Sequence, residues 1–354
     1  MLARKRKTLP KDFQEMLTSA SVDELKAVFG KCAIDARGGY AKGTAIGFPE
    51  CPDELIVWLS EQGLAVDTPD SYGRTPLHAR ASRGAPQQIP LLLSLGADID
   101  AADTSGQTPL QSAVDRLRVD TARALIEHGA STEVVDRRGN TLLTRCLIST
   151  ENAYLRESAE IAKLLLERGA SITAEMRRKV ERIGSNFEFH RETFNRDFLE
   201  ETDTALSELY RMFGVEPVAR RSKHDGVSPI VVPDGTWQER HKALWELLVP
   251  SSGAGATVQC EAIRVTGRIS DEMFRNGGAN WDRDYRAMAD AFPGFVAQGE
   301  PLGEEELREA KELAKEVRSG RGADGQLDRL SELAVAWVAK NPAPIALEAV
   351  GYTR

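Results

Sequence analysis

One short phrase, repeated at a fixed interval, constrains this chain more than any other feature. Each copy is an Asp-x-x-Gly turn followed at once by a polar residue and a threonine. The turn glycines are Gly73, Gly106 and Gly139. A second glycine marker keeps the same step of 33 residues, at Gly63, Gly96 and Gly129. Two markers in phase indicate a repeated structural unit, in which neighbouring copies stack to complete one core.

Each phrase predicts the start of a helix. A glycine allows the chain to reverse with a positive φ, and a threonine hydroxyl then accepts a bond from an unpaired amide of the first helical turn. Proline directly afterwards fits the first helical position, where a missing N–H costs nothing. We therefore expect helices to begin at Thr75, Thr108 and Thr141. A second, amphipathic helix is expected in each unit around residues 89–93, 121–126 and 161–166.

The phrase Thr75-Pro76-Leu77-His78 within this period resembles the ankyrin repeat, closely through residues 67–132 and more weakly on either side. The resemblance implies an all-α solenoid of helix-turn-helix units joined by turn or hairpin loops. It also implies that His78 ties hairpin loops together, and that partners bind at exposed turn positions and along a concave side.

Composition and local patterns divide the chain into five predicted parts. They are an N-terminal cap with a divergent repeat (1–66), the ankyrin repeats (67–172), closing helices (173–214), a linker (215–235) and a C-terminal helical domain (236–354). The cap is expected to contain helices near 11–18, 22–29 and 52–62. The last domain opens with a capping box from Thr236 to Glu239.

Two departures from the repeat pattern attract interest. The unit that contains the third phrase runs 40 residues from Gly129 to Gly169, so about seven extra residues are expected as an inserted loop around 149–157. That loop is either part of a binding surface or a neutral insertion. Arg80 replaces the small residue expected in a packed helix, and we expect it to extend outward along its aliphatic stem rather than to have been recruited for a ligand.

Nine turn residues are candidates for partner binding, because the family makes its contacts at these positions. They are Ser71, Tyr72, Arg74, Thr104, Ser105, Gln107, Arg137, Arg138 and Asn140. Tyr72 and Arg74 are the strongest of them, since tyrosine and arginine are enriched among the residues that dominate interface energy.

The C-terminal part offers a second candidate site. Residues 257–274 are expected to be helical despite several β-branched residues, and Asn280 is expected to cap the next helix. The polar residues that this arrangement could gather are Gln259, Glu261, Asn276, Asn280 and Asp282. Helix-surface ion pairs and an ordinary acidic helix cap explain the same residues equally well.

This half also resembles the C-terminal part of bacterial cytosolic ankyrin proteins. The similar segments are residues 251–253, 259–261 and 276–282. Some such proteins look like immunity partners of toxins, which makes toxin neutralisation an alternative function. A third hypothesis treats the repeats as an arm that targets an enzymatic or ligand-binding C-terminal domain.

Bulk properties narrow the classes of partner. The net charge of −8 and pI near 5.4 argue against nucleic acid as the main partner. Apolar runs fall short of the roughly 18 residues of a membrane span, and no secretory signal is recognised. The four cysteines stand far apart, which favours neither disulfides nor a zinc site. We therefore expect a cytoplasmic protein that does not act on membranes.

Catalytic and cofactor motifs do not stand out. The sequence has no phosphate-binding loop, dinucleotide fingerprint, nucleophile elbow or zinc-protease pair. His241 near Glu239 or Asp234, and Cys260 beside Glu261, are the only pairs worth inspecting. The sequence therefore predicts a non-enzymatic protein-binding module without cofactor or metal, whose partner is another protein.

Overall fold

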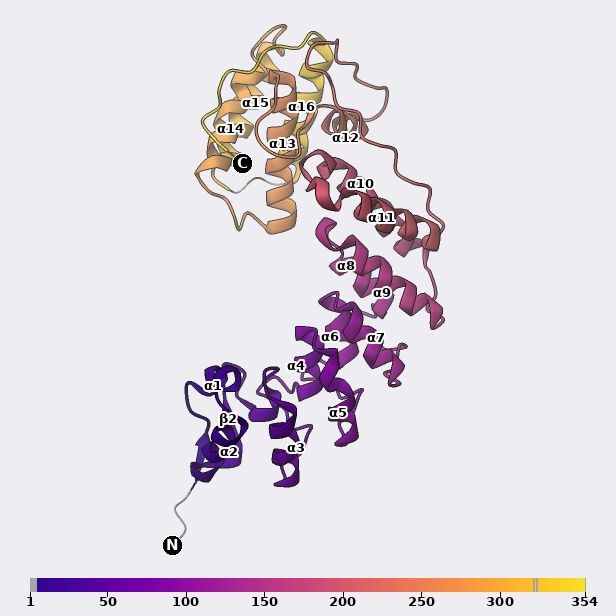
Figure 1. Ribbon diagram of the computed structural model, residues 1–354. Coiled ribbons are helices and arrows are strands. Elements are labelled where there is room, and N and C mark those ends of the chain that lie inside the picture. The colour runs from indigo at the N-terminus through magenta and orange to yellow at the C-terminus, as the bar shows by residue number, and fades with distance from the viewer. Residues whose placement is uncertain (1–4, 321, 323, 354) are drawn as a thin grey trace. The chain divides into compact units, whose positions relative to one another are not determined.

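The computed structural model describes residues 5–320, 322 and 324–353, and most of this length is helical (Figure 1). The chain divides into two compact units. Unit 1 comprises Met1–Asn186 and Arg196–Val218, and unit 2 comprises Phe187–Asn195 and Ala219–Arg354.

Unit 1 begins with a small mixed α/β cap. Its helices are α1 (Phe13–Ser19), α2 (Val22–Lys31) and α3 (Asp53–Glu61). Its three strands are β1 (Arg6–Thr8), β2 (Cys32–Gly38) and β3 (Gly43–Thr44), with β2 central, parallel to β1 and antiparallel to β3. The helices lie where the sequence predicted them, whereas the sheet was not anticipated. The β2–β3 hairpin closes through left-handed backbone at Gly39 and Lys42.

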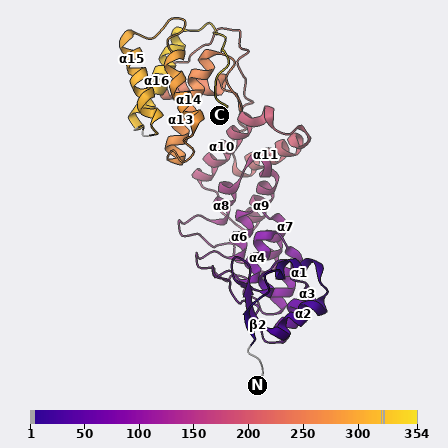
Figure 2. The ribbon, with the colours of Figure 1, turned by 90° about the vertical axis from the view of Figure 1, so that its left-hand side faces the viewer.

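Three helix pairs follow the cap. They are α4 (Pro76–Arg83) with α5 (Ile89–Ser94), α6 (Pro109–Asp115) with α7 (Val119–Glu127), and α8 (Leu142–Ser149) with α9 (Leu155–Glu167). Thr75, Thr108 and Thr141 are the N-cap residues of α4, α6 and α8, as expected. The first helices of the pairs pack in series, α4 on α6 and α6 on α8, and α7 packs on α9 (Figure 2).

The core of unit 1 repeats with the sequence. Leu77, Leu110 and Leu143 occupy equivalent positions one period apart, and all three are buried. The second helices bury Leu92 and Leu125 in the same way. In a single helix pair these leucines would form an apolar face in contact with water. Stacking of the next pair on this face removes it from water.

The extra residues of the long unit are distributed over several elements. Helix α9 has 13 residues where α7 has 9, and α8 has 8 where α6 has 7. The connection between α8 and α9 contains the 3-10 turn Asn152–Tyr154. The insertion therefore mostly lengthens helices, and only part of it forms the loop that the sequence predicted.

Two longer helices close the stack. Helices α10 (Ala174–His190) and α11 (Leu199–Phe213) are joined by 3-10 turns at Arg191–Thr193 and Arg196–Phe198, and α11 packs on α9. Helix α10 is 17 residues long, and its last four residues group with unit 2.

The described residues of unit 2 include five helices that pack around one hydrophobic core, in addition to the end of α10. They are α12 (Trp237–Leu248), α13 (Val258–Asn276), α14 (Arg283–Phe295), α15 (Glu304–Arg318) and α16 (Asp324–Lys340). The capping box of Thr236 and Glu239 is present at the start of α12. The ambiguous segment after residue 257 is a helix, as expected.

The stretch predicted as a linker is largely part of unit 2. The Ile230 side chain is buried in the unit 2 core, and its amide donates to the carbonyl of Pro342. The Arg221 guanidinium donates to carbonyls of Trp245, Glu246 and Val249 at the end of α12. These bonds satisfy carbonyls that the helix end leaves unpaired, so residues 219–235 are anchored rather than free.

Candidate functional site

The three turns of unit 1 are built by one aspartate each. Oδ1 of Asp70, Asp103 and Asp136 accepts bonds from the backbone amides two and four residues further on, at 2.7–3.0 Å. Bonds from Asn140 and neighbouring amides hold the pKa of Asp136 at about 2. These carboxylates are therefore engaged in shaping the turns.

Neighbouring turns are joined at their tips. The amide of Ser71 donates to the carbonyl of Ala41 in the β2–β3 hairpin, at 2.8 Å. Thr104 donates to the carbonyl of Tyr72 through its amide (3.0 Å) and its hydroxyl (2.8 Å). The Arg137 guanidinium donates to the carbonyl of Thr104 at 2.8 Å. The hairpin tip and the three turns thus form one continuous turn-tip edge.

The structure places all nine predicted partner-binding residues on this turn-tip edge. Most are exposed: Ser71, Tyr72, Arg74, Thr104, Ser105, Arg137 and Arg138. Gln107 and Asn140 are half-buried, and each takes part in a bond of the scaffold. Asn140 donates its side-chain amide to Asp136, and the carbonyl of Gln107 accepts from His78.

An aromatic cluster marks the first turn. The ring of Tyr40, at the hairpin tip, is 92% exposed and stacks on Tyr72 with centroids 6.4 Å apart. The Arg74 guanidinium lies 5.6 Å from the centre of the Tyr72 ring, and its Nε is 3.6 Å from Asp103 Oδ2. A side-chain hydrogen bond with Tyr40 favours the neutral phenol and raises the pKa of Tyr72. Exposed tyrosine and arginine side chains held in this way are typical of interface anchors.

Tyr40 was missed because it lies in the divergent cap, outside the repeated phrase. The available signal was local: Gly38 and Gly39 precede it, and Lys42 and Gly43 follow. Glycines at that spacing around a tyrosine indicate a tight hairpin with an exposed tip.

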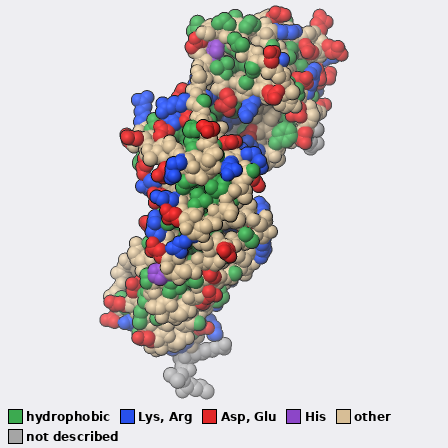
Figure 3. Space-filling view, turned by 90° about the vertical axis from the view of Figure 1, so that its right-hand side faces the viewer, with side chains coloured by type: hydrophobic (Ala, Val, Ile, Leu, Met, Phe, Trp, Pro, Cys, Tyr) green, Lys and Arg blue, Asp and Glu red, His purple; other side chains and the backbone are tan. Residues whose placement is uncertain are grey.

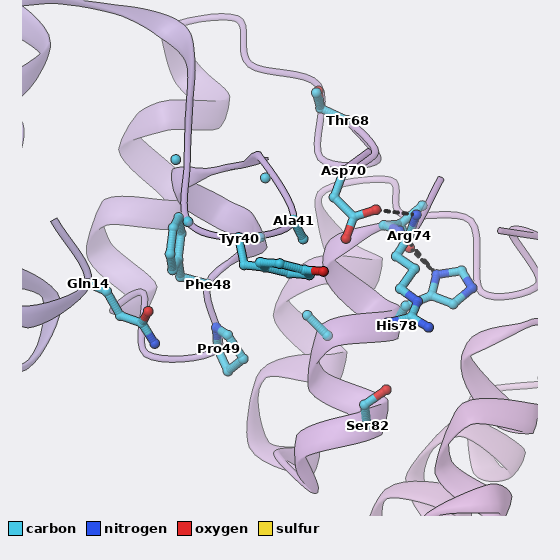
Figure 4. Close-up of a pocket in the computed structure, with 16 residues that line it drawn as sticks. Gln14, Tyr40, Ala41, Phe48, Pro49, Thr68, Asp70, Arg74, His78 and Ser82 are labelled. Carbon is cyan, nitrogen blue, oxygen red and sulfur yellow. Dashed lines mark hydrogen bonds between the residues drawn. The ribbon is translucent and has the colours of Figure 1, made fainter. Parts of the chain in front are cut away.

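A pocket of about 230 Å³ opens beside this cluster, entirely within unit 1 (Figure 4). One wall is the hairpin with Tyr40 and the following Phe48 and Pro49, and the opposite wall is α4 with Ala79 and Ser82. The remaining lining residues are Gln14, Gly38, Gly39, Ala41, Gly43, Gly47, Thr68, Asp70, Arg74, Thr75 and His78.

His78 links the first repeat to the second. Its Nδ1 accepts from the amide of Thr75 at 3.1 Å, so the proton lies on Nε2, which donates to the carbonyl of Gln107 at 2.8 Å. Burial lowers the pKa of His78 and favours this neutral form. The role that the ankyrin resemblance implied for His78 is confirmed.

Arg80 corrects a prediction. Its side chain is fully buried instead of extending to solvent, with Nε bonded to Gln88 Oε1 (2.9 Å) and one terminal nitrogen bonded to the carbonyl of Ile46 (2.6 Å). Burial lowers its pKa to about 10. Arg80 therefore links the cap to the first repeat through the carbonyl of Ile46. The prediction was wrong because this carbonyl lies in the cap, far from Arg80 in the sequence.

The first two residues of the C-terminal candidate site are structural. Gln259 is fully buried, and its amide donates to the carbonyls of Asn341 and Ala343 and accepts from the amide of Ile345. Glu261 is also fully buried. Its carboxylate binds the Arg264 guanidinium at 2.7 and 2.8 Å, the Gly255 amide and the Tyr352 hydroxyl. Both residues hold the C-terminal segment onto α13.

Asn276 and Asn280 form a separate group with Glu272 at the far end of the same helix. The Glu272 carboxylate accepts from the side chain of Asn276 and from the backbone and side chain of Asn280. The predicted cap at Asn280 is wrong: Asp282 caps α14 by accepting from the amides of Asp284 and Tyr285. Helix α13 is 19 residues long, and at 1.5 Å per residue it holds the two groups roughly 20 Å apart.

In the two pairs inspected for catalysis, His241 and Cys260 bond to other groups. Burial lowers the pKa of His241 to about 4, and its Nε2 lies 3.0 Å from the Thr266 hydroxyl. Cys260 Sγ donates to the carbonyl of Leu248, and burial raises its pKa to about 12. Within the described residues, no group of three or more His, Cys, Asp or Glu side chains is placed to hold a metal ion.

Of the helices in the described part of the chain, none combines the length and apolar character needed to cross a membrane.

Comparisons with known proteins identify the repeats of unit 1. A search of curated proteins finds no match. The family model of ankyrin repeats, three copies long, matches residues 81–176, which run from α4 into α10. Residues 81–176, which form most of the helix pairs of unit 1, are therefore ankyrin repeats.

Proposed function

We propose that this chain binds another protein without catalysing a reaction, through the turn-tip edge and the adjoining first helices of unit 1. Ankyrin repeats are in general protein-interaction modules, and residues 81–176 are of this kind. Our proposal goes further than this general role, because it limits the partner surface to one side of the repeats.

The exposed cluster of Tyr40, Tyr72 and Arg74 carries the proposal. A tyrosine that is 92% exposed keeps a large apolar surface in water. A partner that covers the ring removes this surface from water, and the loss of side-chain entropy is small because the ring has few rotatable bonds. The bonds between turns fix the backbone of the turn-tip edge before binding, which lowers the ordering cost of association.

The face formed by the second helices of the repeats differs from the proposed partner surface in its charge pattern. Helices α5, α7 and α9 form the side that faces the viewer in Figure 3, where Lys and Arg side chains alternate with Asp and Glu side chains. Such mixed charge is typical of a surface that stays in water. The four cysteines are free and buried, which supports a reducing compartment, and the proposal therefore includes a cytoplasmic location.

The test compares two double variants with the same amino-acid changes. Tyr72→Ala with Arg74→Ala alters the turn-tip edge. Tyr154→Ala with Arg123→Ala alters exposed residues elsewhere on unit 1: Tyr154 follows the C-terminal end of α8, opposite the turn at its N-terminal end, and Arg123 is on α7. Full-length proteins are used to capture partners from the native host, and the captured protein is then titrated by calorimetry.

We expect the first double variant to weaken binding by about tenfold or more and the second to leave it unchanged. Equal affinities of the wild type and the first variant would refute the proposal.

A further inference from the structure

The pocket beside Tyr40 has the size of a side-chain site. Its volume of about 230 Å³ lies below the roughly 300–1,000 Å³ of pockets that hold drug-sized ligands. A free cofactor of ordinary size does not fit this space, whereas a single large side chain does. The pocket is also continuous with the turn-tip edge, because Tyr40, Asp70 and Arg74 belong to both.

The walls of the pocket favour an aromatic side chain. Tyr40, Phe48 and Pro49 supply ring surfaces on the hairpin side, and Ala79 leaves room on the helix side (Figure 4). The Tyr40 ring stacks on Tyr72, and its 92% exposure shows that it is accessible to a partner ring. Aromatic rings in such surroundings gain from offset or edge-on ring contacts in addition to apolar burial.

The rim of the pocket has a definite charge. The exposed cationic side chains of the turn-tip edge are Lys42, Arg74, Arg137 and Arg138. The aspartates of the same turns are buried or half-buried, and each carboxylate already accepts two backbone amides. A partner therefore meets guanidinium and ammonium groups first, although the chain as a whole has a net charge of −8. This local sign is complementary to an acidic segment.

We propose that the pocket holds one aromatic side chain of an extended partner segment whose neighbouring residues are acidic. The aromatic residue inserts between the β2–β3 hairpin and α4, and the flanking carboxylates follow the row of cations along the turn tips. This inference rests on the proposed function and specifies the chemistry of the partner.

The first experiment selects ligands from a displayed library of random 12-residue peptides, using the immobilised full-length chain. We expect enriched peptides to share one aromatic residue flanked by Asp or Glu. Enrichment of peptides without an aromatic residue, enrichment of basic peptides, or no enrichment over the bare support each overturns the inference.

Two pocket variants then test where the selected peptide binds. Tyr40→Ala removes an exposed wall, and Ala79→Trp fills the space from α4; Tyr154→Ala is the matched control for the first. Fluorescence anisotropy with the labelled consensus peptide is expected to show about tenfold or greater weakening for both pocket variants and none for the control. Undiminished binding to Tyr40→Ala contradicts the inference even if Ala79→Trp fails to fold.

The peptide itself supplies the remaining controls. Replacing its aromatic residue by Ala should weaken binding by about tenfold or more, and affinity should fall as salt is added, because the rim contacts are exposed. A random single-stranded DNA 20-mer that competes more strongly than the peptide would assign the cations to nucleic acid and overturn the inference.

The affinity of the captured partner protein for the same variants tests the proposed function separately. If the captured partner protein loses affinity for the Tyr72→Ala, Arg74→Ala chain but not for the Ala79→Trp and Tyr40→Ala chains, the proposed function stands and the pocket inference fails. If none of these variants loses affinity, both fail.

Discussion

The turn-tip edge of unit 1 and the start of α13 in unit 2 both gather charged and amide side chains, but they use them in opposite ways. In the turns, the aspartates bind the backbone of their own loop, so tyrosine rings and cations remain exposed. At α13, Gln259 and Glu261 are fully buried and bind the C-terminal segment of the chain.

The difference shows that polar character alone does not make a site available to a partner. A buried polar group must be paired, because leaving it unpaired costs more than a hydrogen bond returns. At α13 the pairing is made inside the unit, and little hydrogen-bonding capacity is left for a ligand. On the turn-tip edge, the aspartates, Thr104 and Arg137 bond the backbone of the turns, which fixes the loops, while the rings of Tyr40 and Tyr72 remain exposed.

The largest effect is expected at the buried pair. Glu261→Leu leaves the Arg264 guanidinium buried without its carboxylate, so the free energy of unfolding should fall by about 3–5 kcal/mol. The triple variant Glu261→Leu, Arg264→Met, Tyr352→Phe removes all three polar groups together and should recover most of that loss. Urea unfolding followed by tryptophan fluorescence reports on unit 2, which contains Trp237, Trp245, Trp281 and Trp337.

A loss below about 1 kcal/mol for the single variant would mean that the pair is open to solvent. The two regions would then differ less than their geometry indicates.

The second prediction concerns acid. Burial lowers the pKa of His241 from 6.5 to about 4, so between these pH values the unfolded chain binds a proton that the folded chain does not. Stability contributed by the neutral imidazole is therefore complete above pH 6.5 and is lost as the pH falls towards 4, by at most about 3 kcal/mol.

Urea unfolding at pH 7 and pH 4.5 measures this loss, with His241→Phe as the variant and the exposed His128→Phe as the control. The Thr266 hydroxyl already bonds carbonyls of α13, so the phenylalanine leaves no new unpaired group there. The pH dependence should become shallower in His241→Phe only. An unchanged slope in that variant would show that His241 is hydrated.

The third prediction separates two glycines of the turn-tip edge. Gly73 and Gly106 both have a left-handed φ, 77° and 79°, so alanine at either costs about 1–2 kcal/mol. A Cβ at Gly73 would also lie 2.8 Å from the amide nitrogen of Thr104, whereas the space around Gly106 is open. Gly73→Ala should therefore be more destabilising than Gly106→Ala by about 1–3 kcal/mol.

Thermal unfolding followed by circular dichroism compares the two glycine variants. Equal losses would contradict the close approach of the first two turns, and with it the continuity of the turn-tip edge.

These contrasts also explain how far the sequence could be interpreted. The helix starts at Thr75, Thr108 and Thr141 were predictable because a cap depends on residues within one turn of the helix. The aspartate turns are equally local. Their alignment along one edge followed from the constant period, since equal units stack in register.

Features that depend on distant parts of the chain were not predictable. Gln259 finds its partners 82–86 residues further on, and Arg80 finds a carbonyl 34 residues before it. The cap at Asp282 was misassigned to Asn280 because both residue types cap helices, and only Glu272, eight residues earlier, decides between them. The Tyr40 pocket needs a hairpin from the divergent cap, which no repeat pattern describes.

The smallest effect is expected for the residues with the largest proposed role. Tyr72→Ala with Arg74→Ala changes exposed side chains that contact each other, Tyr40 and Asp103. Asp103 keeps its two amide bonds without Arg74, so the turn persists. The free energy of unfolding should therefore change by less than about 1 kcal/mol, measured by urea unfolding beside the Tyr154→Ala, Arg123→Ala control. A larger loss would mean that these side chains support the fold, and a weakened affinity in this variant would then no longer identify a binding surface.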